Sequence, residues 1–226
     1  FAFVLYAAAG TVGLFDAQIS AALTAIVILS MVLTPVTTMV LGRLMPKETQ
    51  DPDAADGVER AENLRERVLI IGFGRFAQVV SQPLLARDVD VSIIENDVEM
   101  IQAAGKFGFK VYYGDGTRLD VLRASGVDKA EAVLVCIDKP EQADRIVEVI
   151  RAEFPMTQLF VRAYDRGHSM RLIQAGVDYQ IRETFESALV FGEQVLKDLG
   201  ASDEEARETI EDVRRRDEDR LVLQLS

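Results

Sequence analysis

The feature that most constrains this 226-residue chain is one continuous stretch, residues 67–97, with the sequence RVLIIGFGRFAQVVSQPLLARDVDVSIIEND. An apolar run leads into Gly72 and Gly74, and after an amphipathic segment a second apolar run ends on Glu95. This order predicts a β-strand, a glycine turn, an α-helix and a parallel strand that ends on an acid. In such a unit the first glycine allows the tight turn, and the second lets the backbone approach a phosphate. The small Ala77 permits close packing of the helix on the sheet.

The same stretch predicts an adenine nucleotide as ligand. The helix points its unpaired N–H groups and the positive end of its dipole at the turn, where a pyrophosphate would lie. Glu95 follows Gly74 by 21 positions, and an acid at the tip of the second strand would accept hydrogen bonds from ribose hydroxyls and repel a 2′-phosphate. The alternative is a domain that keeps this geometry without a ligand.

The chain after this unit continues to alternate between the two kinds of element. Apolar runs predict further strands, and amphipathic segments predict helices between them, so we expect an α/β fold with a doubly wound, parallel Rossmann-like sheet in the order 3-2-1-4-5-6. Pro83 falls inside the first predicted helix and is expected to kink it. The further strands are expected at residues 110–113, 131–137, 160–163 and 177–180, and the helices at 97–107, 118–125, 138–153 and 167–175.

A second turn, Gly114-Asp115-Gly116-Thr117, closes the third predicted strand. In a doubly wound sheet this turn lies at the carboxyl edge beside the first turn, so its backbone and Asp115 can face a bound adenosine. A plain turn or helix cap explains the same residues equally well.

The N-terminal part has a different composition. Residues 1–42 contain one charged residue, Asp16, and the uncharged run 17–42 is long enough to cross a bilayer. Arg43 and Lys47 follow the run, which places that end on the cytoplasmic side. A buried helix of a water-soluble protein is the alternative. Because the chain begins at Phe1 rather than Met, we expect a membrane domain that starts upstream.

The charges and the scarce metal-binding residues exclude several classes of protein. Residues 43–226 hold all 25 Lys and Arg but 36 acids, a net charge of −11 (25 minus 36), which argues against nucleic acid. Cys136 is the single cysteine, so no intrachain disulfide forms, and its apolar surroundings indicate a core residue. His168 is the single histidine, and no metal site is expected.

The C-terminal part begins after the predicted sheet is complete. Thr184 to Leu199 predicts a helix with an apolar face that we expect to pack on a second copy of the chain, although it could fold back on its own domain. Residues 202–219 are almost all charged and predict a solvated helix. The expected domains are transmembrane helices at 1–45, a linker at 46–66, the nucleotide-binding domain at 67–183, and a dimerisation helix with a charged tail at 184–226.

Several motifs together resemble a known family. GFGRFA, FGFKVYYGDGTR, the strand ending in IDKP, VRAYDRGH, MRLIQAGV and RETFESAL are similar to the RCK or KTN (TrkA-N) domain of Kef-type glutathione-regulated potassium efflux systems. The opening FAFV and the LTP-containing run resemble the end of the transporter domain of that monovalent cation:proton antiporter family.

The resemblance implies two sets of site residues. AMP or NAD(H) is expected at the carboxyl edge of the sheet. Glutathione or its adducts are expected at arginines between subunits, namely Arg75, Arg162 and Arg171. The nucleotide-binding residues implied are Gly72, Gly74, Arg75, Phe76, Glu95, Asn96, Asp115, Gly116, Thr117 and Arg118.

The resemblance also implies a function without catalysis. The chain would be the cytoplasmic regulatory domain of a dimeric potassium/proton antiporter, attached to a lipid bilayer in the bacterial inner membrane and gated by its ligands. One alternative is an NAD-dependent oxidoreductase, but the sheet is followed by only one apolar helix and a charged tail, which leaves no substrate domain. Another is the sensor of a potassium channel, but TVGLF at residues 11–15 lacks the Tyr-Gly pair of a selectivity filter.

Overall fold

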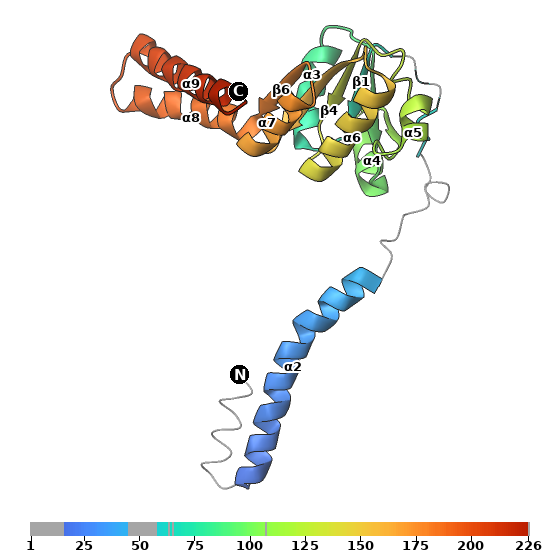
Figure 1. Cartoon of the computed structure of the whole chain (residues 1–226), viewed down its shortest axis with the longest axis vertical. Coiled ribbons are helices and arrows are strands. Elements are labelled where there is room, and N and C mark those ends of the chain that lie inside the picture. The colour runs from blue at the N-terminus through green and yellow to red at the C-terminus, as the bar shows by residue number, and fades with distance from the viewer. Residues whose placement is uncertain (1–15, 45–57, 63, 65, 107, 226) are drawn as a thin grey trace. The chain divides into compact units, whose positions relative to one another are not determined.

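The computed structural model describes the chain in two compact units, Phe1–Thr49 and Gln50–Ser226 (Figure 1). The predictions for residues 1–15 and 46–57 lie outside the described residues. The residues described are 16–44, 58–62, 64, 66–106 and 108–225.

The described part of the first unit is the helix α2 (Ala17–Leu44), which contains Pro35. The hydroxyls of Ser30 and Thr37 donate hydrogen bonds to backbone carbonyls about one turn earlier, which satisfies these polar side chains within the helix. No helix among the described residues is long and apolar enough to cross a membrane. The run predicted at 17–42 is helical as part of α2, so its helical conformation is confirmed, whereas its prediction as a membrane span is not.

The second unit is built on a six-stranded sheet in the order β3-β2-β1-β4-β5-β6, with every neighbouring pair parallel. This is the α/β class and the strand order that the sequence predicts. The order reverses between β1 and β4, which places the carboxyl ends of these strands at a crevice typical of ligand sites. The strands are β1 (Val68–Ile71), β2 (Val91–Glu95), β3 (Val111–Tyr113), β4 (Ala132–Val135), β5 (Gln158–Ala163) and β6 (Tyr179–Arg182).

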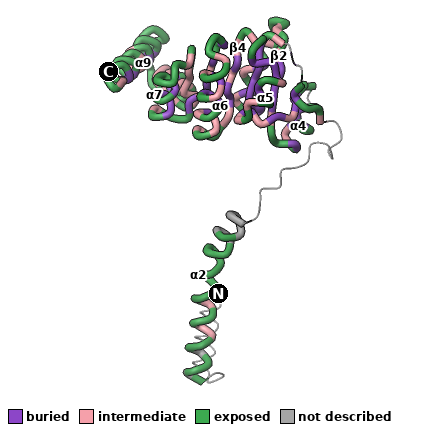
Figure 2. Tube along the Cα trace, turned by 45° about the vertical axis from the view of Figure 1, so that its right-hand side comes forward, coloured by how far each residue is buried: buried purple, intermediate pink, exposed green. Residues whose placement is uncertain are grey.

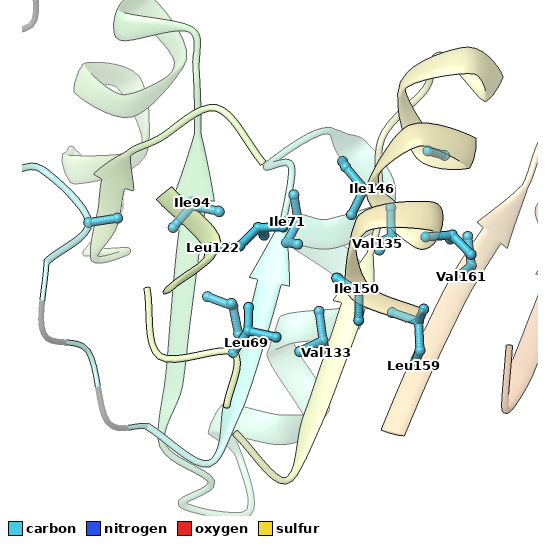
Figure 3. Close-up of a cluster of buried hydrophobic side chains, with 14 of the residues drawn as sticks. Leu69, Ile71, Ile94, Leu122, Val133, Val135, Ile146, Ile150, Leu159 and Val161 are labelled. Carbon is cyan, nitrogen blue, oxygen red and sulfur yellow. The ribbon is translucent and has the colours of Figure 1, made fainter. Parts of the chain in front are cut away.

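Helices cover the sheet on both faces and bury two apolar clusters (Figure 2), one of which is drawn in Figure 3. Alternate residues of β1 belong to different clusters, because successive side chains of a strand point to opposite faces. Ile70 packs in the cluster of α3 and α4, whereas Leu69 and Ile71 pack in the cluster of α5, α6 and α7. These helices are α3 (Arg75–Leu85), α4 (Val98–Gly105), α5 (Leu119–Ala124), α6 (Pro140–Glu153) and α7 (Arg166–Gln174).

Pro83 lies in the last turn of α3, since the helix ends at Leu85. The sequence predicts that this proline lies well inside the first helix and kinks it. In the structure it lies close to the helix end, where a proline removes one hydrogen bond from a helix that is about to stop.

The last described residues of the stretch expected to be a linker, 46–66, contribute to the sheet and to its core. The Ala61 N–H donates to the Tyr113 carbonyl (3.0 Å), and the Tyr113 N–H donates to the Glu59 carbonyl (2.7 Å). Ala61 and Leu64 are buried. A Cβ at Gly126 would lie 2.3 Å from the Leu64 carbonyl oxygen, so this segment also requires the glycine after α5.

Two further helices, α8 (Glu183–Asp198) and α9 (Asp203–Leu225), follow the sheet and pack on each other. α9 is longer than the charged helix predicted at 202–219, and it includes the final apolar residues. α8 buries Leu189 but leaves a set of large apolar side chains exposed, namely Val190, Phe191, Val195 and Leu199. We call these four residues the α8 stripe.

A groove of about 430 Å³ lies over the sheet on the face that also carries α3. Leu134, Phe160 and Ile181 of β4, β5 and β6 form its floor, and Val80 and Pro83 of α3 form part of its wall. We call this the β4–β6 groove. It shows that α3 leaves part of the second half of the sheet uncovered on this face.

Candidate functional site

The glycine turn has the geometry that the sequence predicts. Gly72 has a φ of +91°, a region that favours glycine, and a Cβ there would lie 3.0 Å from Ile137 Cγ1. Gly74 is the N-cap of α3 and offers no side-chain cap to the helix. A Cβ at Gly74 would meet only Asp138 carboxylate oxygens, at 3.8 and 3.9 Å. The fold itself therefore tolerates a methyl group at Gly74, and the free space lies at the uncapped N-terminus of a helix, where anions bind.

Glu95 joins this turn to the end of β2. Its Oε2 accepts a hydrogen bond from the Phe73 N–H (2.8 Å), and its Oε1 accepts from the N–H groups of Asn96 (2.7 Å) and Asp97 (3.1 Å). A carboxylate has about four acceptor positions. The backbone uses three of them here, so Glu95 is fixed in place and keeps room for a ribose hydroxyl.

The second turn lies against the first. The Gly114 N–H donates to the Glu95 carbonyl (2.9 Å), and a Cβ at Gly116 would lie 2.5 Å from Ile71 Cγ2. Asp115 Oδ1 accepts from both the N–H (3.0 Å) and the hydroxyl (2.7 Å) of Thr117. The structure thus shows Asp115 in a local turn, which is the plainer of the two sequence interpretations.

Exposed basic and polar side chains lie around these turns. Arg75 lies at the start of α3 and is exposed, as is Asn96 at the end of β2. Arg118 donates to Asp120 through a surface ion pair at 2.8 Å, and such pairs exchange partners at little cost. The predicted nucleotide-binding residues therefore lie in three consecutive segments at the carboxyl ends of β1, β2 and β3.

The predicted glutathione arginines do not form one cluster in this unit. Arg162 of β5 lies with its guanidinium 5.5 Å from the ring of Phe76 and pairs with Asp138 and Glu183. Arg171 of α7 instead pairs with Asp144 at 3.1 Å. Arg162 and Arg171 thus pair with different carboxylates.

Sequence reasoning missed a buried cluster at the C-terminal end. Asp217 of α9 is 5% exposed and accepts hydrogen bonds from Arg166 and Arg182. Burial opposes ionisation of Asp217, but the two guanidinium groups outweigh it, so the pKa of Asp217 lies below its ordinary value. Arg182 also stacks 4.1 Å from the ring of Phe185. Because Asp217 stands among many charged residues of a helix interpreted as solvated, no pattern distinguished it.

One further segment, which carries no predicted site residue, also reaches the glycine turn. Ile137 and Asp138 follow β4 and lie against Gly72 and Gly74. Their position after the fourth strand, beside the point where the strand order reverses, was the signal that could have found them.

Cys136 and His168 have structural roles. Burial raises the pKa of the Cys136 thiol to about 12, so the core assignment is confirmed and the thiol is inert. His168 is 1% exposed, and its Nδ1 accepts the Tyr164 N–H at 3.0 Å. Burial is the main cause that lowers the pKa of His168. The described residues contain no group of three His, Cys, Asp or Glu side chains that could hold a metal ion.

With this geometry in view, comparison with known proteins places the chain in a family. Residues 68–183 match the TrkA-N domain. The chain belongs to the TrkA-N domain family. Over 225 residues it is 43% identical to a glutathione-regulated potassium-efflux system protein of Haemophilus influenzae, an alignment that covers 98% of this chain and 36% of that protein. The resemblance to Kef systems is therefore confirmed.

Solved structures give the same answer for the fold. The Kef C-terminal domain of Shewanella denitrificans, described in its AMP-bound form, is 34% identical with a TM-score of 0.60, and the match covers 68% of this chain and 94% of that one. The GsuK channel, described as bound to NAD, is 17% identical with a TM-score of 0.54, covering 79% of this chain and 33% of that one. At that identity the second likeness shows the fold alone.

These relatives also indicate whether the domain is an enzyme and how much of a longer protein the chain spans. They are named as a potassium-efflux system protein and as a Kef C-terminal domain rather than as enzymes, which confirms the prediction that this TrkA-N domain is not an enzyme. The chain spans about a third of the length of the curated relatives that it matches.

Proposed function

We propose that this TrkA-N domain is a nucleotide-binding regulatory domain of a potassium efflux system, with AMP or NAD(H) at the carboxyl ends of β1, β2 and β3. The observation that carries the proposal is the space at Gly74. The protein could accept a Cβ there, since its nearest contacts would be 3.8 Å away, yet the position has none and leaves the N-terminus of α3 open to a phosphate. The relative described with AMP supports the choice of ligand.

The remaining residues would each contact a different part of the nucleotide. The N–H groups of the first turn of α3 bind the phosphate, and Arg75 and Arg118 neutralise its charge from the rim. Glu95 accepts from a ribose hydroxyl, and its charge disfavours a 2′-phosphate. Asp115 to Thr117 lie beside the adenosine. This arrangement favours AMP and NAD(H) over NADP(H).

The regulatory output requires a second copy of the chain. The α8 stripe is apolar and exposed, and the β4–β6 groove offers an apolar surface. We propose a homodimer in which the stripe of one copy is covered by the other, as expected for a large exposed apolar surface.

The whole protein would carry out ligand-gated potassium/proton antiport in the bacterial inner membrane, with this domain on the cytoplasmic side. The name of the Haemophilus influenzae relative supports potassium efflux under glutathione control. Arg75, Arg162 and Arg171 are the proposed contacts for a glutathione-like anion, because guanidinium groups bind carboxylates in a bidentate manner. Nucleotide binding would shift the population between dimer arrangements, and that shift would gate transport.

The experiment is a calorimetric titration of the chain with AMP, NADH and NADPH, repeated on Gly74→Ala. We expect AMP and NADH to bind more tightly than NADPH. We expect Gly74→Ala to lower the affinity for AMP at least about ten-fold, because its methyl group occupies the phosphate position. Gly105→Ala is the matched control, since a Cβ at Gly105 meets nothing within 4 Å.

Equal affinities for AMP in Gly74→Ala and Gly105→Ala would contradict the site. A separate titration with glutathione tests the arginine contacts. Potassium efflux from cells that express the whole protein, with and without Gly74→Ala, tests whether the site controls transport. Unchanged efflux in a variant that no longer binds nucleotide would remove the regulatory role.

A further inference from the structure

Arg162 is placed between the glycine turn and the first residue of α8. It lies on β5, and its side chain is 17% exposed. Its guanidinium contacts three other parts of the fold: Asp138 after β4, Glu183 at the start of α8, and the ring of Phe76 in the first turn of α3. A single cation thus connects the proposed phosphate position to the helix that carries the α8 stripe.

The Arg162 guanidinium makes two different kinds of contact with its two carboxylate partners. Nη1 donates a hydrogen bond to Asp138 Oδ1. Nη2 lies 2.6 Å from Glu183 Oε2, but this buried oxygen receives no properly directed hydrogen bond. The Glu183 contact is therefore an ion pair without hydrogen-bond alignment, whereas the Asp138 contact is hydrogen-bonded.

The hydrogen-bonded partner, Asp138, faces the glycine turn. The Asp138 carboxylate oxygens lie 3.8 and 3.9 Å from the position of a Cβ at Gly74. An anion bound at this turn would come close to Asp138, and the combined negative charge would attract Arg162 more strongly than Asp138 does alone. Because the guanidinium would move toward this larger negative charge, its contact with Glu183 would weaken.

The Glu183 carboxylate would still be stabilised if it lost its contact with Arg162. It is the first residue of α8, whose N-cap, Arg182, makes no side-chain hydrogen bond to the helix. A carboxylate in the first turn is stabilised by the helix dipole and by the unpaired N–H groups there. The exchange of Arg162 between its two partners therefore leaves no charge without a counterpart.

We propose that Arg162 is the positioning residue that couples phosphate binding at the glycine turn to the first turn of α8. An occupied turn holds Arg162 toward Asp138 and releases Glu183, and an empty turn lets Arg162 hold Glu183. This inference rests on the proposed nucleotide site. It makes the start of α8, and through it the α8 stripe, the element that responds to the ligand.

Linkage gives the proposal a sign that can be measured. If AMP weakens the contact between Arg162 and Glu183, then removing the charge of Glu183 must raise the affinity for AMP. We expect Glu183→Gln to raise the affinity for AMP about five-fold, the effect of one partly exposed charge pair. Glu186→Gln is the matched control: it lies in the same first turn of α8 but pairs with Arg214 at 2.8 Å, and we expect it to leave the affinity within about two-fold.

A second readout separates coupling from a merely structural role. Hydrogen–deuterium exchange of the first turns of α8 is measured with and without AMP in the wild-type chain and in both variants. We expect AMP to increase exchange there in the wild type and in Glu186→Gln, and to leave it unchanged in Glu183→Gln, which still binds AMP.

Three outcomes decide the matter. Tighter AMP binding in Glu183→Gln with a lost exchange response supports the coupling. Equal behaviour of Glu183→Gln and Glu186→Gln, with AMP bound by all three proteins, overturns the coupling and leaves the proposed site intact. Failure of the folded wild-type chain to bind AMP or NADH overturns the proposed function, and the coupling with it.

Discussion

At the scale of single residues, the site depends on glycines with different reasons to be glycine. Gly72 has a positive φ, whereas Gly74 has ordinary dihedrals and free space where a phosphate would lie. Gly116 is different again, because a Cβ there would lie 2.5 Å from Ile71 Cγ2. The same residue type therefore serves backbone conformation, ligand access and core packing within one site.

The packing role of Gly116 leads to a prediction for stability. Gly116→Ala should lower the free energy of unfolding by about 1–3 kcal/mol, because its methyl group overpacks the contact with Ile71. Gly105→Ala, in open space at the end of α4, should be neutral or slightly stabilising. Urea denaturation of both variants measures the difference.

A double-mutant cycle checks the cause. Ile71→Ala alone should cost about 2–5 kcal/mol through the cavity it leaves. Added to Gly116→Ala, it should cost less than it does alone, because it removes the atom that the new methyl group meets. Additive costs for the two changes would show that the overpacked contact lies elsewhere.

The residues of the site show how far a sequence can be interpreted. Gly72, Gly74 and Glu95 were predictable because each follows directly from the path of one strand–turn–helix–strand unit. Asp138, Arg162 and Glu183 meet through strands that are neighbours in the sheet but distant in the chain, so their contacts could not be inferred from local spacing. Asp217 was missed for the same reason, since its two arginines come from α7 and β6.

At the scale of elements, the strand order was predictable from alternation and from the handedness of parallel connections. The ends of the elements were less predictable. α3 ends soon after Pro83, and residues 59–61 add a short pairing to β3 because that edge strand has free backbone groups. Local composition, which is charged and contains proline, gave no sign of this pairing.

The element that most needs a test is α8. Phe191 is 74% exposed in the α8 stripe, and burial of such an aromatic side chain is typical of the centre of an interface. We expect Phe191→Asp to weaken dimerisation at least about 30-fold. Sedimentation equilibrium measures the dissociation constant.

Met156→Asp is the control for this change, since Met156 is 93% exposed outside the α8 stripe and the β4–β6 groove. It should leave association unchanged. A wild-type chain that is monomeric at all concentrations would contradict the proposed dimer, as would equal dissociation constants for the two variants.

At the scale of the whole molecule, the second unit joins a sheet edge with the geometry of a nucleotide site to the helical hairpin of α8 and α9. Gly74 and Glu95 lie at the carboxyl edge of the sheet. Arg162 of β5 connects this edge to α8, and Asp217 connects α9 to the same region. Ligand site, connecting residue and exposed apolar helix thus follow one another in space. This order is what a domain that regulates by binding requires, and it needs no catalytic group.

The central claim is that an adenine nucleotide binds at the carboxyl ends of β1, β2 and β3. The most direct measurement is a crystal structure of the chain grown with AMP. The account predicts the phosphate against the N–H groups that follow Gly74, a ribose hydroxyl within hydrogen-bond distance of Glu95, and Arg162 closer to Asp138 than to Glu183. A structure in which AMP binds elsewhere, with the space at Gly74 free of the nucleotide, would contradict it.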